Sequence, residues 1–136
     1  MKIMLDEGAK VSRAHPYDAG LDLYARETQI VPAKESAVFD TGVHIELPLC
    51  TTGFLKSRSG LNVRHGIVSD GGVIDAGYTG SIRVKIYNHS GYDYTVHAGD
   101  RIAQLVILKC ELPELELVDS LEETDRGDNG FGSTGR

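Results

Sequence analysis

Residues 71–88 read Gly-Gly-Val-Ile-Asp-Ala-Gly-Tyr-Thr-Gly-Ser-Ile-Arg-Val-Lys-Ile-Tyr-Asn, and no other stretch of the chain carries as much information. Two apolar residues lead into the carboxylate of Asp75 and a turn bounded by glycines, and a strand rich in β-branched residues follows. The pattern predicts a β-hairpin whose tip carries an acid, Asp75, and an aromatic ring, Tyr78. Glycines at such a tip let a ligand approach the backbone closely. Asp75 therefore has two interpretations, a cap of the turn or a group that acts on a bound ligand.

Short strand signals separated by turn residues occupy most of the remaining chain. They predict strands at 21–25, 28–31, 36–39, 43–47, 53–56, 83–87, 92–96, 101–108 and 115–119. Alternation at 83–87 indicates a half-buried strand, whereas the nearly continuous apolar run at 101–108 indicates burial on both faces. Segment 59–66 starts with an N-cap candidate, Ser59, and ends at Gly66, which predicts one short helix. The spacing is typical of an all-β sandwich, jelly roll or barrel.

Composition limits the classes of function. The chain has 136 residues, which predicts a single domain, and a net charge of −6, which argues against a general grip on nucleic acid. It holds no apolar run long enough for a membrane span, and its first residues are too quickly charged for a signal peptide. Cys50 and Cys110 fit no disulfide framework or zinc site, so we expect both to be reduced in a cytoplasmic protein.

The last fifteen residues differ in composition from the rest. Residues 122–136 contain one large apolar side chain, so burial cannot offset their ordering entropy, and we expect a flexible arm after a β-barrel domain at 1–121. The arm nevertheless carries a cation, close backbone N–H groups and two hydroxyls, all suited to phosphate: Arg126, Gly132, Ser133 and Thr134. Phe131 offers a flat face for stacking on a base. The alternative is a disordered end without a function.

A second candidate for anion binding lies at Arg58-Ser59-Gly60. It combines a guanidinium, a hydroxyl and an unobstructed backbone N–H at the predicted helix start, where the helix dipole favours an anion. A capped helix with a solvated arginine is the alternative. Taken alone, segment 19–23 is typical of the start of a strand, and segment 99–104 is typical of a turn that leads into a strand.

Taken together and in this order, five segments resemble the motifs of the homotrimeric dUTPase family. They are 19–25, 58–61, 72–80 with the strand that follows, 99–104 and 126–135, and they span almost the whole chain. The resemblance implies a distorted jelly-roll β-barrel with at most one short helix, assembled as a homotrimer. It also implies Mg²⁺-assisted hydrolysis of dUTP to dUMP and pyrophosphate, which limits uracil incorporation into DNA and supplies dUMP for thymidylate synthesis. Each active site would be built from three chains, with the arm of one closing over a site between the other two.

The same resemblance assigns roles to the hairpin. Asp75 would be the base that activates water for attack on the α-phosphorus. Tyr78 would stack beneath the deoxyribose and exclude a 2′-hydroxyl. Main-chain groups of Gly72, Val73, Ile74 and Asp75, and others near Arg83, would read the uracil edge. Ser69 stands where many bacterial relatives place an Asn that contacts the ligand.

The phosphate contacts are implied in the same way. The phosphate chain would lie against Arg58, Ser59, Gly60 and Gln104, and the γ-phosphate against Arg126, Gly132, Ser133 and Thr134, with Phe131 over the uracil. Mg²⁺ would be held by the three phosphates and water without a direct protein ligand, and Asp22 would act at most through a water. Ser57 and Asn129 depart from the family pattern, which commonly has Pro and Gly there.

Three alternative functions follow from the same residues. A dCTP deaminase-type relative is disfavoured because Asp75 has only Ala76, Gly77 and Thr79 beside it and no glutamate. A dUTP-binding regulator that acts through a protein partner fits the same motifs. A capsid-type jelly-roll assembly protein gives no reason for an arm with phosphate-binding groups.

Overall fold

The structure is a computed structural model that describes residues 1–127 and 129 of the chain. The predicted site residues Phe131, Gly132, Ser133 and Thr134 lie outside the described residues. The strands are β1 (Lys2–Leu5), β2 (Val11–Ser12), β3 (Gly20–Tyr24), β4 (Gln29–Val31), β5 (Ser36–Asp40), β6 (Val43–Glu46), β7 (Thr51–Lys56), β8 (Ile67–Asp70), β9 (Val73–Ile74), β10 (Arg83–Asn88), β11 (Tyr94–Val96) and β12 (Arg101–Lys109), and the helix is α1 (Ser59–His65). The prediction of an all-β fold with one short helix is confirmed.

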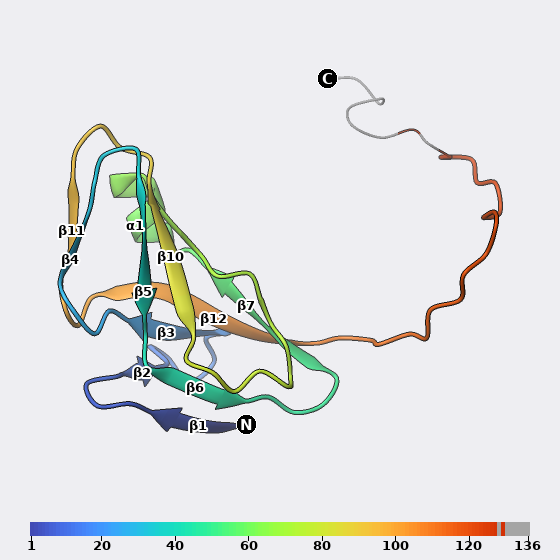
Figure 1. The fold of residues 1–136 in the computed structure, drawn as a ribbon, viewed down its shortest axis with the longest axis horizontal. Helices are drawn as coiled ribbons and strands as arrows, with labels where there is room; N and C mark the ends of the chain where they lie inside the picture. The colour runs from blue at the N-terminus through green and yellow to red at the C-terminus, as the bar shows by residue number, and fades with distance from the viewer. Residues whose placement is uncertain (128, 130–136) are drawn as a thin grey trace.

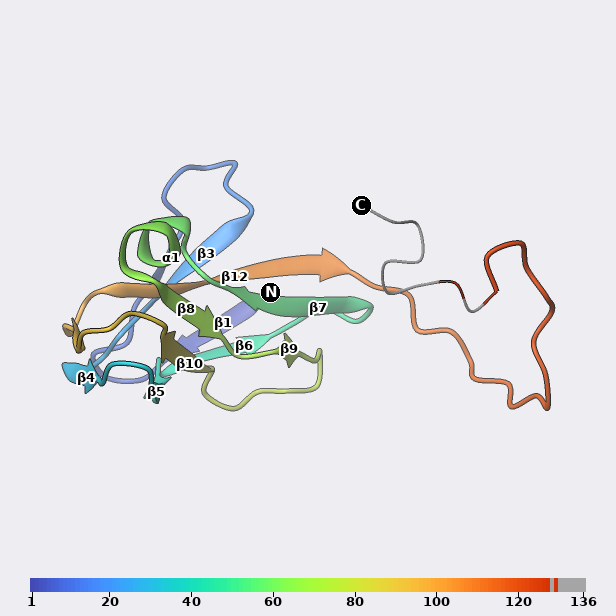
Figure 2. The ribbon, with the colours of Figure 1, turned by 90° about the horizontal axis from the view of Figure 1, so that it is seen from above.

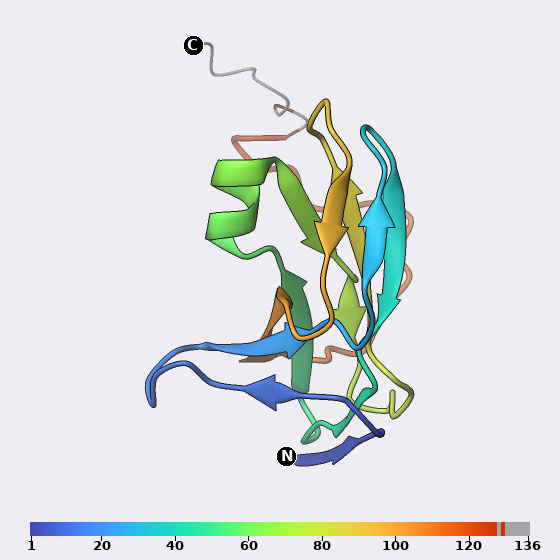
Figure 3. The ribbon, with the colours of Figure 1, turned by 90° about the vertical axis from the view of Figure 1, so that its left-hand side faces the viewer.

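All strand pairs are antiparallel within the described chain, and they form four small sheets around one core. The largest has the order β2-β3-β12-β7-β9, and the others are β5-β10-β8, β1-β6 and β4-β11. In Figure 3, β4, β5, β10 and β11 stand side by side, while β3 crosses beneath them and α1 lies to one side. The core is made of buried aliphatic side chains and Phe39, with Leu23, Ile67, Val84 and Leu105 almost completely buried.

The burial predicted from the sequence patterns is confirmed for β10 and only in part for β12. In β10, Val84 and Ile86 are buried while Arg83 and Lys85 are exposed, as the alternating pattern predicted. The prediction of two-sided burial for 101–108 holds for Ile102, Ala103 and Leu105 but is wrong for the end of the strand, where Leu108 is exposed. Pairing explains the difference, because β3 reaches only as far as Val106, and β12 continues against β7 alone.

The predicted hairpin is wrong in the identity of its arms. Strand β10 pairs with β8 and β5, whereas β9 pairs with β7, so Val73 and Ile74 do not face the strand that follows them. Strands β8 and β10 form the hairpin, and residues 71–82 are its long connection, which joins the edge of the five-stranded sheet through β9. The pairing of β9 with β7 cannot be predicted from local sequence, because it depends on where β7 lies in the fold.

Helix α1 confirms the predicted short helix but corrects its start. Arg58, with an extended backbone, is the N-cap residue, and Ser59 is the first helical residue and does not cap it. The helix ends before Gly66, as predicted. No residue of α1 is buried, and the helix contacts mainly β8.

The predicted strand at 115–119 is also wrong. The described chain forms no strand after Lys109, and Leu115 and Leu117 are exposed. Figures 1 and 2 show this segment leaving the barrel after β12. The alternating apolar residues have no neighbouring strand or core within the described part of this chain. None of the described helices combines the length and apolar character that a membrane crossing requires.

Candidate active site

A buried carboxylate, Asp22, organises the first part of the site. Its side chain is 2% exposed, and it lies between two arginines, with Arg58 Nε 3.5 Å from Oδ1 and Arg101 Nη1 3.2 Å from Oδ2. The Gln104 amide donates a hydrogen bond of 3.3 Å to Oδ1. A buried charge is tolerated only when it is paired and hydrogen-bonded, and Asp22 meets this condition with three partners.

Strand pairing brings these residues together from distant parts of the sequence. Asp22 on β3 lies opposite Gln104 on β12, and the register shifts between Arg101 and Ala103. Such an irregularity changes the direction of the neighbouring side chains, and here Arg101 reaches the same carboxylate as Gln104. Arg58 arrives from the start of α1 and also donates to the Arg101 carbonyl at 3.3 Å. Segments 19–25, 58–61 and 99–104 therefore form one cluster.

The cluster presents positive charge to a surface hollow. The Arg58 and Arg101 side chains are 26% and 43% exposed, so their heads are positioned by Asp22 and still reach solvent. A cavity of about 260 Å³ lies beside them, lined by Tyr24, Arg58, Leu61, Tyr94, Val96, Gly99, Asp100, Arg101 and Ile102. Ser59 and Gly60 lie next to Arg58 in the exposed first turn of α1. Pre-oriented guanidinium groups of this kind suit a phosphate chain.

Ser57 and Ser69 fasten this cluster to the next strand. The Ser57 hydroxyl donates to the Ser69 carbonyl at 2.9 Å and accepts from the Ser69 N–H at 2.8 Å. Ser69 is buried, and its own hydroxyl has no hydrogen-bond partner among the described residues. The departure from Pro at position 57 thus provides two hydrogen bonds that the sequence pattern did not reveal.

The second part of the site is the connection at 71–82. Its turn cap is Asp70, whose carboxylate accepts the N–H groups of Gly71 and Gly72 at 2.7 and 2.9 Å. These hydrogen bonds, that of Gly72 first, lower the pKa of Asp70 below its ordinary value. Asp75 is exposed, and its carboxylate accepts no hydrogen bond from the described residues. The capping role that was open for Asp75 therefore belongs to Asp70.

Tyr78 lies folded back over its own turn. Its N–H donates to the Asp75 carbonyl at 3.0 Å, and its hydroxyl donates to the Ser81 carbonyl at 2.9 Å. A Cβ on Gly80 would lie 2.6 Å from the Tyr78 hydroxyl oxygen, so a side chain there would displace the ring from this position. The ring face is partly open, because Tyr78 is 43% exposed.

Strand β9 gives the main chain of Val73 and Ile74 one free edge. It is the outermost strand of its sheet, and it is held by β7, whose Leu55 N–H donates to the Gly72 carbonyl at 3.3 Å. The Ile74 side chain is buried in the core, so only its backbone could contact a ligand. An unpaired strand edge offers a row of donors and acceptors, which is the chemistry needed to read the edge of a base. Arg83 starts β10 with an exposed side chain.

One chain does not bring all the predicted residues together. In Figures 1, 2 and 3, α1 and the connection before β10 lie on different sides of the barrel. Arg126 lies on the segment that leaves the barrel, and its Nε donates to the Asn129 carbonyl at 3.1 Å. The arginine cluster, Asp75 and the arm are thus three separate parts within a single chain.

The described side chains supply no protein cage for a metal. Among residues 1–127 and 129, no group of three His, Cys, Asp or Glu side chains could hold a metal ion. Both oxygens of Asp22 already face cations or the Gln104 amide, so its action on Mg²⁺ through a water stays a prediction. The partly exposed Arg58 and Arg101 could bind phosphate oxygens, and a Mg²⁺ would then be held by the phosphates and water.

Asp22→Ala is expected to weaken both the fold and the site. Removing the carboxylate leaves Arg58 and Arg101 without their anchor, and the free energy of unfolding should fall by about 1–3 kcal/mol, because both arginines can still reach water. Urea unfolding measures this change, and the KM for a nucleotide substrate should rise in parallel. Asp119→Ala, which removes an exposed carboxylate, is the control. Unchanged stability and KM in Asp22→Ala would contradict the anchoring role.

Comparisons with known proteins identify the family of the chain. The dUTPase family model matches residues 6–135. The probable deoxyuridine 5'-triphosphate nucleotidohydrolase of Schizosaccharomyces pombe is 48% identical over 117 residues, covering 86% of this chain and 84% of that protein. The Kluyveromyces lactis deoxyuridine 5'-triphosphate nucleotidohydrolase is 44% identical over 119 residues, covering 87% of this chain and 80% of that protein.

Solved structures show the same fold. The dUTPase of Staphylococcus bacteriophage 80alpha, solved with dUPNHPP, superposes with a TM-score of 0.91 at 32% identity and covers 99% of this chain and 98% of its own. A mutant of the dUTPase from phage phi11 of S. aureus, described with a structural Mg(II) ion, superposes with a TM-score of 0.82 at 31% identity. The match covers 90% of this chain and 98% of that one. From its sequence and its fold, the chain belongs to the dUTPase family.

Proposed function

We propose that this chain hydrolyses dUTP to dUMP and pyrophosphate by Asp75-activated attack of water on the α-phosphorus. The observation that carries the proposal is the family match over residues 6–135, which includes every motif of the predicted site. As a member of this family, with relatives named deoxyuridine 5'-triphosphate nucleotidohydrolase, the chain is a dUTP diphosphatase and a hydrolase. This activity limits uracil in DNA and supplies dUMP for thymidylate synthesis.

The proposed mechanism divides the work between the two parts of the barrel. Asp75 takes a proton from water while the water oxygen attacks the α-phosphorus, and the bond to the bridging oxygen breaks, releasing pyrophosphate. Arg58 and Gln104, positioned by Asp22, bind the phosphate chain and stabilise its charge. A Mg²⁺ held by the phosphates and water would neutralise part of their negative charge. The free edge of β9 selects uracil, and the Tyr78 ring selects the deoxyribose.

We propose a homotrimer with shared active sites for the complete enzyme. The separation of the arginine cluster and Asp75 within one chain supports this, because in a trimer neighbouring chains could bring these two parts together. The exposed leucines at 112, 115, 117 and 121 are further support, since apolar side chains in this number favour burial against another surface. We further propose a β-barrel domain at 1–121, a functional arm at 122–136 and a cytoplasmic location. Nucleic acid and membranes are not proposed as partners.

A regulatory role is the second candidate. The bacteriophage 80alpha dUTPase is described as controlling the transfer of virulence genes. This supports asking whether the present chain also signals through a protein partner when dUTP is bound. A variant that binds dUTP without hydrolysing it separates the two roles, because a regulator retains its partner while turnover is lost.

The substrate preference is the direct test of the proposed function. Purified chain with Mg²⁺ should release pyrophosphate from dUTP and much less from dCTP, dTTP and UTP. In Tyr78→Ala, hydrolysis of UTP relative to dUTP should rise by about tenfold or more, because the ring that excludes the 2′-hydroxyl is gone. Tyr92→Ala, which removes an exposed tyrosine elsewhere, is the control. Equal release from all four nucleotides by the unmodified chain would refute the proposed specificity.

A further inference from the structure

The connection at 71–82 is anchored firmly at both ends and weakly in its middle. At its start, β9 pairs with β7. At its end, the Ile82 N–H donates to the Val43 carbonyl at 2.9 Å, and the Ser81 hydroxyl binds Asp40. Residues 75–80, which carry Asp75 and Tyr78, lie between these anchors.

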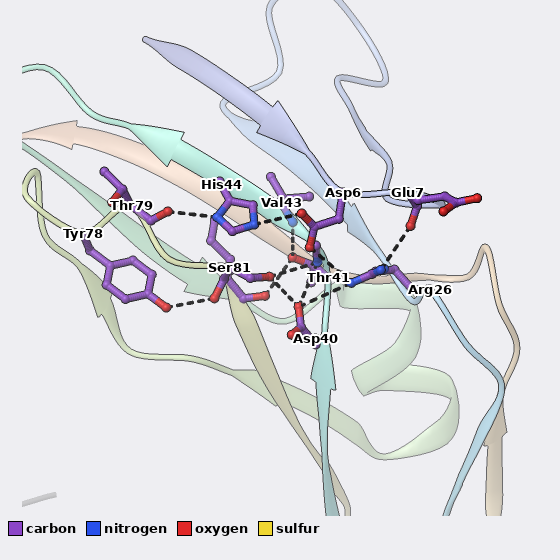
Figure 4. Close-up of polar contacts among 12 residues, drawn as sticks. Asp6, Glu7, Arg26, Asp40, Thr41, Val43, His44, Tyr78, Thr79 and Ser81 are labelled. Atoms are coloured by element: carbon purple, nitrogen blue, oxygen red, sulfur yellow. Dashed lines mark hydrogen bonds and ion pairs between the residues drawn. The ribbon is translucent and has the colours of Figure 1, made fainter.

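His44 supplies the only side-chain hydrogen bond that reaches residues 75–80 from another element of the described structure. Its Nδ1 donates to the Thr79 carbonyl at 2.9 Å. Its Nε2 lies 3.3 Å from Asp6 Oδ1, in the turn after β1. Figure 4 shows the imidazole between these two oxygens. The side chain is 19% exposed, and the buried Nε2 atom has no hydrogen-bond partner among the described residues, so it meets Asp6 as an ion pair.

We propose that His44 is a positioning residue, which holds the turn that bears Asp75 and Tyr78 against the N-terminal segment through Thr79 and Asp6. The proposal rests on the proposed function, because it assigns a catalytic purpose to the geometry of that turn. A turn that is fixed at Thr79 limits the motion of Tyr78, the preceding residue, whose ring is proposed to select the sugar. Small displacements of reacting groups lower rates strongly, so one hydrogen bond at this place has a large effect.

The contact depends on the protonation of His44. Both ring nitrogens face oxygen acceptors, and a neutral imidazole has only one N–H. The pKa of His44 is raised above its ordinary value by the hydrogen bond to the Thr79 carbonyl and by Asp6, with a smaller contribution from Asp40. Once the ring loses its proton while Nδ1–H stays on Thr79, the Nε2 lone pair faces the Asp6 carboxylate and repels it.

The surrounding charges do not replace this interaction. Arg26 Nη1 lies 3.4 Å from Asp6 Oδ2 and 4.0 Å from Asp40 Oδ1, so it pairs with the Asp6 oxygen that does not face His44. On the same pair of strands, Lys2 and Glu46 neutralise each other at 3.0 Å. Because the folded pKa is raised, the stabilisation is complete below the unfolded pKa of about 6.5 and is lost as the pH rises through the folded value.

Hydrogen–deuterium exchange tests the positioning role without relying on turnover. In the full chain, His44→Ala should speed exchange at residues 75–82 by about tenfold or more, while β3 and β12 exchange as in the unmodified protein. In the same variant, kcat/KM for dUTP should fall by about tenfold to a hundredfold, and the preference for dUTP over UTP should fall with it. The pH dependence gives a further readout, since protection of 75–82 relative to the intrinsic exchange rate should decrease above neutral pH.

Three variants sharpen the result. His44→Asn places an amide N–H where Nδ1 lies, so it should restore the Thr79 contact and most of the protection but abolish the pH dependence. Asp6→Asn removes the charge and should shift the loss of protection to lower pH. His15→Asn is the matched control. The Nδ1 atom of His15 lies 3.0 Å from Asp18 Oδ2 in an exposed pair, which involves no residue of the turn. If His44→Ala fails to fold, His44→Asn and Asp6→Asn provide the test.

Unchanged exchange at 75–82 in His44→Ala would overturn the proposal. Faster exchange with unchanged kcat/KM and nucleotide preference would overturn it as well, since the contact would then be structural only. A different result would contradict the proposed mechanism, namely near-normal turnover of dUTP by Asp75→Asn. That result would not change the interpretation of the exchange data.

Discussion

Asp75→Asn is expected to lower kcat for dUTP by about 10²–10⁴-fold, the usual contribution of a general base. Asparagine has the shape of aspartate but cannot take the proton from water. The side chain is exposed and accepts no hydrogen bond from the described residues, so neither the fold nor the turn requires its charge. Pyrophosphate release measures the loss, and isothermal titration with dUTP should give a Kd within a few-fold of the unmodified value.

The control for this experiment is Glu27→Gln, an equally isosteric loss of charge at an exposed residue between β3 and β4. It should leave kcat and the thermal midpoint unchanged. Near-normal pyrophosphate release by Asp75→Asn would show that the proposed mechanism is wrong. A combined loss of turnover and dUTP binding would instead place Asp75 in substrate recognition.

Deletion of the residues after Asp125 is expected to slow hydrolysis by about a hundredfold or more without unfolding the protein. The deletion removes Arg126 and the proposed phosphate contacts at 132–134, together with the stacking ring of Phe131. Loss of a single donor to developing charge already costs about 10²–10³-fold in kcat. The fold should persist, because the described chain forms no strand after Lys109 and residues 111–127 are exposed.

A matched variant separates the chemistry of the arm from its length. A variant in which a Gly/Ser segment of equal length replaces residues 126–136 should hydrolyse dUTP as slowly as the deletion variant. If only the length of the arm mattered, the replacement variant would keep its activity. Circular dichroism and sedimentation check that the fold and the oligomeric state survive in both. Unchanged kinetics in the deletion would reduce the arm to an end without a function.

Local sequence patterns predicted elements more successfully than their pairing. The strand at 83–87 was predicted correctly, because alternate side chains of a strand face opposite sides and only one side meets the core. The hairpin was predicted wrongly, because Val73 and Ile74 pair with β7, a strand that ends at Lys56 and is separated from them by α1 and β8. No local pattern specifies a partner at that distance. Segment 115–119 failed for a related reason, since alternation marks a strand only where a neighbour exists.

The site shows the same division. Motif residues such as Arg58, Gln104 and Asp75 were identified from the sequence, but the anchoring of Arg58 by the buried Asp22 was not. Asp70 and His44 were missed, and Ser57 was noted only as a departure from the family pattern, for the same reason. Their roles are hydrogen bonds to backbone groups, which leave no signature in the identity of the residues that they hold.

The sequence by itself determined the class of the fold, the short helix and the family, because turn residues, strand periodicity and ordered motifs are properties of the chain as written. The tertiary structure alone decided that Asp22 gathers two arginines, that Asp70 rather than Asp75 caps the turn, and that β9 lies at a sheet edge. The physical reason is that hydrogen bonds and ion pairs depend on positions in space. In this barrel those positions are set by antiparallel pairing between segments far apart in the chain.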